Sequence, residues 1–218
     1  GKDYDNLLTV DIICHGTPSP MLWENYIDWI GQSHEISHVN FRSKRLCWEI
    51  SRLESDFKDC GYLLNRIANN FYMKLFHICL TQRPSCHACK FRFPNADSDI
   101  TCGDAWGIKN FAPEMNDDKG ASVVIIHTAK GQRFFDKANL KIKPIDFEVL
   151  KKYNPHALIP AAEDSRRKDF FAEIAESKDR VAVMKKYFSQ DNKKITADNR
   201  KRNLKISDER YKKILAHF

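Results

Sequence analysis

The sequence predicts an α/β or α+β fold, in which a mixed sheet is flanked by helices. Two short apolar stretches rich in β-branched residues, 7–14 and 121–128, are typical of buried strands. Segments whose apolar residues recur at helical spacing alternate with them. An irregular cysteine-rich loop and a helical, basic C-terminal segment complete the predicted architecture.

The first predicted strand, 7–14, leads through "CHGTPSP" into a helix. Ser19 is a suitable N-cap, and Pro20 occupies the first helical position. Apolar residues then follow at helical spacing as far as Gly31, which predicts the end of the helix. The chain therefore begins with a strand, a tight loop and a helix.

The middle of the chain predicts a hairpin and a second helix. The stretches 36–42 and 46–54 are β-like and are joined around "SKR". Residues 62–80 have the pattern of one helix. The cysteine segment follows, and Pro84 and Pro94 keep it out of regular structure.

The last part of the chain is predicted to be mainly helical. A short helix from Gly131 to Asn139 follows the strand at 121–128, and an edge strand is expected at 140–145. From residue 146 onward every segment has a helical pattern. We therefore expect a core over residues 1–155 and a helical basic extension over residues 156–218.

The net charge of +7 lies in the C-terminal part of the chain. Residues 1–150 hold 18 Lys and Arg against 19 Asp and Glu, whereas residues 151–218 hold 18 against 10. The stretch "DNKKITADNRKRNLK" could contact nucleic acid or an anionic lipid surface. Because no aromatic residues interrupt these charges as stacking platforms, a solvated helical extension is favoured and nucleic acid is not an expected partner.

The cysteine content indicates a reducing compartment. There are seven cysteines, and the opening "GKDYDNLLTV" is too polar for a signal peptide. In the cytoplasm clustered cysteines are metal ligands or reactive thiols rather than disulfides. The uncharged run at 12–23 contains two prolines and is too short for a bilayer. A cytoplasmic protein without a membrane span is expected.

Four cysteines form a candidate ligand set. Cys86 and Cys89 make a C-x-x-C turn, in which two thiolates can reach one metal or cluster. Cys79 lies seven residues upstream, and Cys14 ends the first predicted strand. Four thiolates suffice for a 4Fe-4S cluster or for an all-thiolate zinc site.

The other cysteines and two histidines leave alternatives open. Cys102 is a further candidate ligand, while Cys47 is interpreted as a small buried hydrophobe and Cys60 as a loop thiol without a metal. His77 and His87 are close enough in sequence to replace a thiolate in a zinc site.

Two glycine-containing stretches are candidate cofactor contacts. Gly16 follows Cys14 at a helix N-terminus, where backbone N–H groups gather. In "GDAWG", Gly103 allows close approach to a flat cofactor, Asp104 can accept hydrogen bonds and Trp106 can exclude water. The alternatives are an ordinary strand-to-helix connection and a tryptophan that anchors a turn. No catalytic residue is identified.

Three stretches in this order, "VDIICHGTPSPMLWENYI", "CLTQRPSCHACKF" and "SDITCGDAWGI", closely resemble the C-terminal domain of the coenzyme F(420) hydrogenase/dehydrogenase beta-subunit family. The stretch "KGASVVIIHTAKGQRFF" also looks like a later part of that domain. The resemblance covers roughly residues 5–140.

The resemblance implies an iron–sulfur flavoprotein oxidoreductase module. Its 4Fe-4S ligands would be Cys14, Cys86 and Cys89, with Cys79 as the fourth. Electrons would pass between the cluster and FAD, and the acceptor would be the deazaflavin coenzyme or another redox partner.

Full-length members carry an N-terminal region, often with a ferredoxin-like domain. The resemblance therefore implies a truncated chain whose partner is that domain or a separate redox protein, and part of the FAD site is expected outside it.

The residues also suggest two other functions. The alternative is a non-catalytic zinc-binding module that uses Cys79, Cys86, Cys89 and a histidine or Cys14, with the basic tail contacting nucleic acid. A Cys14 nucleophile activated by His15 is disfavoured, because adjacent strand residues point to opposite faces. The sequence contains no G-x-G-x-x-G, P-loop or H-E-x-x-H motif, so it does not support nucleotide dehydrogenase, NTPase or zincin functions.

Overall fold

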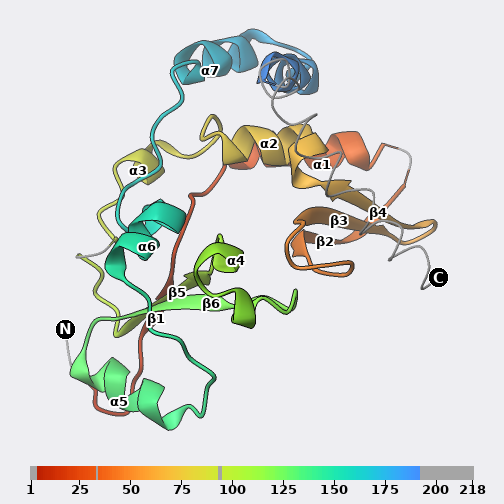
Figure 1. Ribbon diagram of the computed structural model, residues 1–218. Coiled ribbons are helices and arrows are strands. Elements are labelled where there is room, and N and C mark those ends of the chain that lie inside the picture. The colour runs from red at the N-terminus through yellow and green to blue at the C-terminus, as the bar shows by residue number, and fades with distance from the viewer. Residues whose placement is uncertain (1–3, 33, 93–94, 192–218) are drawn as a thin grey trace.

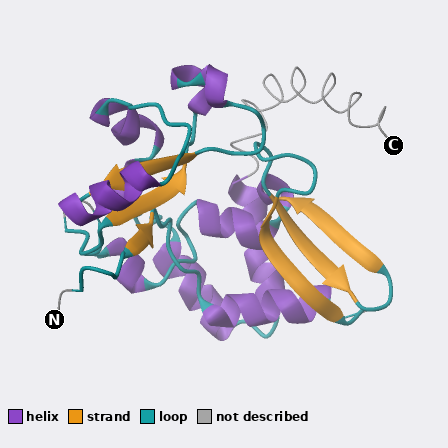
Figure 2. Ribbon diagram, turned by 90° about the horizontal axis from the view of Figure 1, so that it is seen from below, coloured by secondary structure: helices purple, strands orange, loops and turns teal. Residues whose placement is uncertain are grey.

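The computed structural model describes residues 4–32, 34–92 and 95–191. These residues form a mixed α/β fold with two three-stranded sheets, and helices flank them, as the sequence predicts. Figure 1 labels the elements, and Figure 2 shows helices between the two sheets.

The first sheet has the strand order β1–β5–β6. Strand β1 (Val10–Ile12) pairs in parallel with β5 (Ile100–Asp104), and β5 pairs antiparallel with β6 (Ser122–Ile126). Beyond the end of β1, the N–H of Ile13 donates to the carbonyl of Cys102 at 2.8 Å. Because β1 and β5 are parallel, the "CHG" stretch after β1 and the "GDAWG" stretch of β5 lie at the same edge of the sheet.

The second sheet is an antiparallel meander of β2 (Ile36–Ser43), β3 (Arg52–Phe57) and β4 (Gly61–Arg66). The predicted hairpin is confirmed, although its second strand begins at Arg52 and the connection is longer than "SKR".

The helices occupy most of the remaining described chain. Helix α1 begins at Pro20 and ends at Ile30, next to Gly31, as predicted. The α-helices are α1 (Pro20–Ile30), α2 (Phe71–His77), α3 (Pro84–His87), α4 (Ile108–Phe111), α5 (Ala129–Lys137), α6 (Phe147–Tyr153) and α7 (Arg167–Glu176), and the 3-10 helices are η1 (Ile67–Asn69), η2 (Pro113–Met115) and η3 (Pro155–Ala157).

Residues 180–191 are also helical, without a label in Figure 1. The basic stretch that begins at Asp191 lies almost entirely outside the described residues, and so does the rest of the chain that was predicted to be helical, up to residue 218. None of the helices described here combines the length and the hydrophobicity that crossing a membrane requires.

The prediction of one helix over 62–80 is wrong. Its first part is β4, which pairs along its length with β3, and η1 and α2 follow. The break falls at Asn70, whose side chain accepts the N–H of Met73 and so caps α2. The ladder with β3 and this cap outweigh the helical spacing of the apolar residues.

The predicted edge strand at 140–145 is also absent. Residues 140–145 are held in place by a side chain instead, because Lys143 Nζ donates to the carbonyl of Phe111 at 3.0 Å.

The strand predicted at 7–14 is present only as β1, and the prediction that both of its faces are buried is wrong. Val10 and Ile12 are 54 % and 72 % exposed, since β1 is an edge strand of the small sheet.

Two apolar cores hold these elements together. The larger joins α1, β3, α2, α7 and the helix at 180–191, with Tyr26, Leu75 and Phe170 fully buried. The smaller joins the end of β5 with β6, α4 and α6. The residues between β1 and α1 connect the two cores, and a domain boundary near residue 155 stays a prediction.

Candidate functional site

The segment after β1 runs beside the segment that leads into α3. Ser19 N–H donates to the carbonyl of Thr81 at 2.9 Å, and Arg83 N–H donates to the carbonyl of Thr17 at 2.8 Å. These two bonds, with a single β-bridge between them, fix an antiparallel crossing of two irregular segments. The crossing therefore brings the strand end that carries Cys14 next to residues 79–89, which we call the cysteine loop.

Cys86 lies directly against this strand end. The N–H of Thr17 donates to Cys86 Sγ at 3.2 Å, a contact that stabilises a thiolate. Gly16 has φ +144°, and a Cβ at this position would lie 2.6 Å from Gln82 Cγ and 3.5 Å from Cys86 Sγ. Only glycine allows this backbone conformation and this close approach.

Cys79 occupies the position after α2 that glycine usually takes. Its φ of 64° is left-handed, its N–H donates to the carbonyl of Phe76, and the next N–H, from Leu80, donates to that of Leu75. These two bonds define a Schellman motif. A cysteine here costs conformational energy that a glycine would avoid, which favours a role for its thiol.

A group of histidines surrounds Cys79. Its Sγ lies 3.7 Å from Nε2 of His15, which donates to the carbonyl of Phe76 at 3.2 Å. The rings of His77 and His156 lie 5.4 and 4.7 Å from that of His15. Burial lowers the pKa of all three imidazoles, that of His77 to about 4, so they pack here as neutral rings at neutral pH.

Cys14 and Cys89 line the same small cavity, together with Arg92 and Thr101. Cys102 follows Thr101 along β5, so its side chain points to the opposite face of the strand. Burial, and secondarily the charge of Asp11, raise the pKa of the Cys102 thiol. The cavity thus brings together two predicted ligands, while Cys102 points away from it.

The four thiols do not form a ready site for a single ion. All four are free of disulfide bonds. In the part of the chain that the structure describes, no three of their sulfur atoms lie within 4.8 Å of one another. A zinc ion with Zn–S bonds of about 2.3 Å would hold its sulfurs roughly 3.8 Å apart. In a cluster each thiolate binds a different iron, which requires a wider arrangement.

Unpaired polar atoms gather around the cysteine loop. Buried side-chain atoms with no hydrogen-bond partner among the described residues include Thr81 Oγ1, Gln82 Oε1, His87 Nε2, Arg92 Nε and His156 Nδ1. Buried polar atoms are almost always paired in native proteins. Their concentration here is what a bound polar or ionic group would explain, so the donors present fit an iron–sulfur centre.

Gly103 is explained by packing within the protein. A Cβ on Gly103 would lie 2.7 Å from the nearest side-chain atom of Ile13. The glycine therefore allows the chain after β1 to pack closely against β5.

Asp104 and Trp106 belong to a neighbouring cluster. Arg42 pairs with Asp104 through Nε and Nη2 at 3.1 and 3.0 Å. The guanidinium lies 5.0 Å from the ring of Trp106, which is 42 % exposed and stacks on Trp48 at 5.8 Å. Sequence reasoning missed Arg42 and Trp48, because they come from β2 and the connection after it and share no motif with "GDAWG".

A cavity of about 670 Å³ opens beside this cluster, at Ala105. It lies between β6, α4 and the 140–145 segment. Its walls are mainly apolar, with Ile108, Phe111 and Val123 among the lining residues. Its size and character are those of small-molecule and cofactor pockets.

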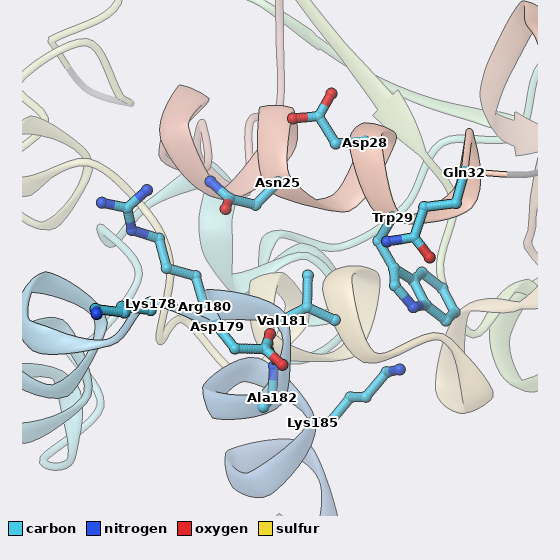
Figure 3. A pocket seen from close by; sticks show the side chains of 10 residues that line it. All are labelled: Asn25, Asp28, Trp29, Gln32, Lys178, Asp179, Arg180, Val181, Ala182 and Lys185. Atoms are coloured by element: carbon cyan, nitrogen blue, oxygen red, sulfur yellow. Dashed lines mark hydrogen bonds between the residues drawn. The ribbon is translucent and has the colours of Figure 1, made fainter.

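Two further features lie outside the predicted site. At the β3–β4 turn, next to the start of β2, exposed ligand atoms of His34, Asp59 and Cys60 lie within 4.8 Å of one another. Figure 3 shows the side chains that line a hollow between α1 and residues 178–185. The hollow has a volume of about 490 Å³. It is lined by Asn25, Asp28, Trp29, Gln32, Lys178, Asp179, Arg180, Val181, Ala182 and Lys185.

Comparison with known proteins identifies the family. A family model that describes the C terminus of the beta subunit in coenzyme F420 hydrogenase/dehydrogenase matches residues 2–148. Neither the curated proteins nor the solved structures contain a match. The matched range includes β1, the cysteine loop and β5, whose residues carry the three motifs. The chain therefore belongs to the C-terminal domain family of coenzyme F420 hydrogenase/dehydrogenase beta subunits.

Proposed function

We propose that this module of a hydrogenase or dehydrogenase beta subunit passes electrons between a 4Fe-4S cluster and FAD. The proposed cluster ligands are Cys14, Cys79, Cys86 and Cys89. The observation that supports this most strongly is that the segments carrying them meet around residues 14–17, although they are far apart in sequence. The unpaired buried atoms around the loop support the same centre.

The chain itself would supply position, burial and electrostatics. The Thr17 N–H directed at Cys86 stabilises negative charge on that sulfur. The neutral ring of His15 lies against Cys79 Sγ on one side, and the ring of His77 packs against that of His15. When bound, a cluster supplies single electrons and FAD stores two, so the pair connects one- and two-electron partners.

The proposed flavin contacts are Asp104 and Trp106, next to the cavity that opens at Ala105. Arg42 holds the carboxylate of Asp104 in one orientation, and the exposed Trp106 offers an aromatic face. Gly16 and Gly103 would contribute indirectly, by allowing the close packing of Cys86 and Ile13. The electron partner would be a redox protein in the same complex, and the deazaflavin coenzyme of the family's description is a candidate acceptor.

Anaerobic reconstitution with iron and sulfide tests this proposal. We expect a brown protein with about four irons and four sulfides per chain, and an electron paramagnetic resonance signal after reduction. In a fluorescence titration with FAD, Trp106→Ala should bind the flavin more weakly than the wild type does.

A colourless protein that takes up one zinc ion per chain under the same conditions would contradict the cluster. That outcome would support the zinc-binding alternative instead.

A further inference from the structure

The chain that follows the matched family region covers the cysteine loop. Residues 154–167 run from α6 past α3 to α7, as Figure 1 shows. Nδ1 of His87, in α3, donates to the carbonyl of the buried Ala161 at 2.9 Å. The family match ends at residue 148, so this cover lies beyond it.

At the end of the cover, the first residue of α7 contributes a buried cation. Arg167 is 9 % exposed, and its Nη1 donates to the carbonyl of Leu80 at 2.8 Å. Leu80 directly follows Cys79, so this bond holds the start of the cysteine loop. The guanidinium also lies 4.4 Å from the ring of Phe171, which fixes its orientation.

Within the described residues, the charge of Arg167 is only weakly compensated by carboxylates. It pairs with Glu163 at 3.7 Å, and the side chain of Glu163 is 57 % exposed. Burial lowers the pKa of Arg167, and this effect exceeds the opposing effects of Glu163 and Cys86. A guanidinium nevertheless stays charged in proteins, so a buried one requires negative charge nearby. Cys86, whose charge acts on Arg167, belongs to the same loop that Arg167 contacts at Leu80.

We propose that Arg167 is a positioning residue for the metal centre. It holds the cysteine loop through the Leu80 carbonyl, and its charge offsets the negative charge of the bound thiolates. The inference rests on the proposed function, because the thiolates are those of the cluster. A positive charge beside a cluster stabilises its reduced, more negative form. Removing it should lower the reduction potential and weaken retention of the cluster.

The neighbouring arginine provides a matched control. Arg166 pairs with Asp164 at 2.6 Å through Nη2 and at 2.9 Å through Nε, and its side chain is 31 % exposed. Arg166→Gln therefore removes the same charge one position away, without removing the Leu80 contact. Arg167→Lys keeps the charge but not the planar fork of donors.

Two measurements on the full chain test the inference. In reconstituted protein, we expect Arg167→Gln to release iron to a chelator about 10- to 100-fold faster than the wild type. Its reduction potential should be more negative, whereas Arg167→Lys should keep a potential close to that of the wild type. In protein without metal, Arg167→Gln should speed hydrogen exchange of the amides of residues 79–89. Arg166→Gln should behave as the wild type in every measurement, and circular dichroism checks that each variant is folded.

Iron release, potential and exchange that are the same in Arg167→Gln and Arg166→Gln would overturn the inference and leave the proposed function intact. A wild-type chain that takes up no cluster would instead overturn the proposed function, and the charge-offset role with it. In that case the exchange measurement still decides whether Arg167 holds the loop.

Discussion

The β2–β3–β4 meander and the cysteine loop are held in place in different ways. In the meander each strand pairs with its neighbour in sequence through a backbone ladder, which is continuous between β3 and β4 and has register shifts between β2 and β3. The cysteine loop is held by single bonds to distant residues, such as that from Thr17 N–H to Cys86 Sγ across 69 positions. Ladder pairing satisfies backbone groups without help, whereas a loop without such pairing depends on each individual contact.

The difference also concerns polar atoms inside the protein. The loop is surrounded by buried donors and acceptors that lack hydrogen-bond partners among the described residues, including His87 Nε2 and Arg92 Nε. The meander has fewer such atoms, and two of them, Arg42 Nη2 and Glu54 Oε1, take part in ion pairs. A loop with this environment is stabilised by whatever binds to it, because binding to the folded state raises its stability. We therefore expect the loop, but not the meander, to respond strongly to the loss of the centre.

Two glycines, one in each region, offer the sharpest test of this comparison. Gly16→Ala places a methyl group 2.6 Å from the Gln82 side chain at a backbone angle that alanine avoids. Strain and overpacking together should lower the free energy of unfolding by about 2–4 kcal/mol. The shift of the Gln82–Cys86 segment should also reduce iron uptake.

Gly61→Ala is the matched control, in the hairpin turn of the meander. Its φ of +88° is also positive, but nothing lies within 4 Å of the added methyl group. Its cost should be about 1 kcal/mol, with iron uptake unchanged. Urea denaturation and iron analysis measure both effects, and equal losses in the two variants would contradict the comparison.

A smaller change separates folding from ligand binding at Cys79. Cys79→Gly should raise the free energy of unfolding of the metal-free protein by about 1 kcal/mol, because glycine adopts the left-handed conformation without strain. The same variant should lose the four-iron centre. Cys79→Ala should also lose it but gain no stability, since alanine keeps the β-carbon.

Thermal unfolding of the metal-free variants and iron analysis after reconstitution measure these effects. A Cys79→Gly variant that keeps four irons per chain would exclude Cys79 as a ligand.

Much of the fold could be predicted from local patterns. Helix α1 has its proline and glycine signals at its ends, and β6 is a compact β-branched run, so both were predicted nearly as they occur. The stretch 62–80 was misinterpreted because its apolar spacing suits a helix, while pairing with β3 and the Asn70 cap are not visible in spacing. Non-local pairing decided this segment against its local preference.

The candidate site could be predicted only as a set of residue types. The C-x-x-C turn and the motifs singled out Cys86, Cys89 and Cys14, and "GDAWG" singled out Trp106. Arg42 and Arg167 could not be found this way. Each reaches its partner through tertiary packing, across 62 positions to Asp104 and 87 positions to Leu80. Charged residues in a highly charged chain give no signal until the fold places them.

The most direct test of the account is the iron and sulfide content of reconstituted Cys14→Ser, together with its low-temperature electron paramagnetic resonance spectrum. Cys14 is the predicted ligand most distant in sequence from the cysteine loop, so its role depends entirely on the crossing of the two segments. We expect Cys14→Ser to lose the signal of the four-iron cluster, while Cys47→Ser, which changes a thiol near Arg52 in the other half of the fold, keeps it. A Cys14→Ser protein with four irons, four sulfides and the wild-type spectrum would contradict the account.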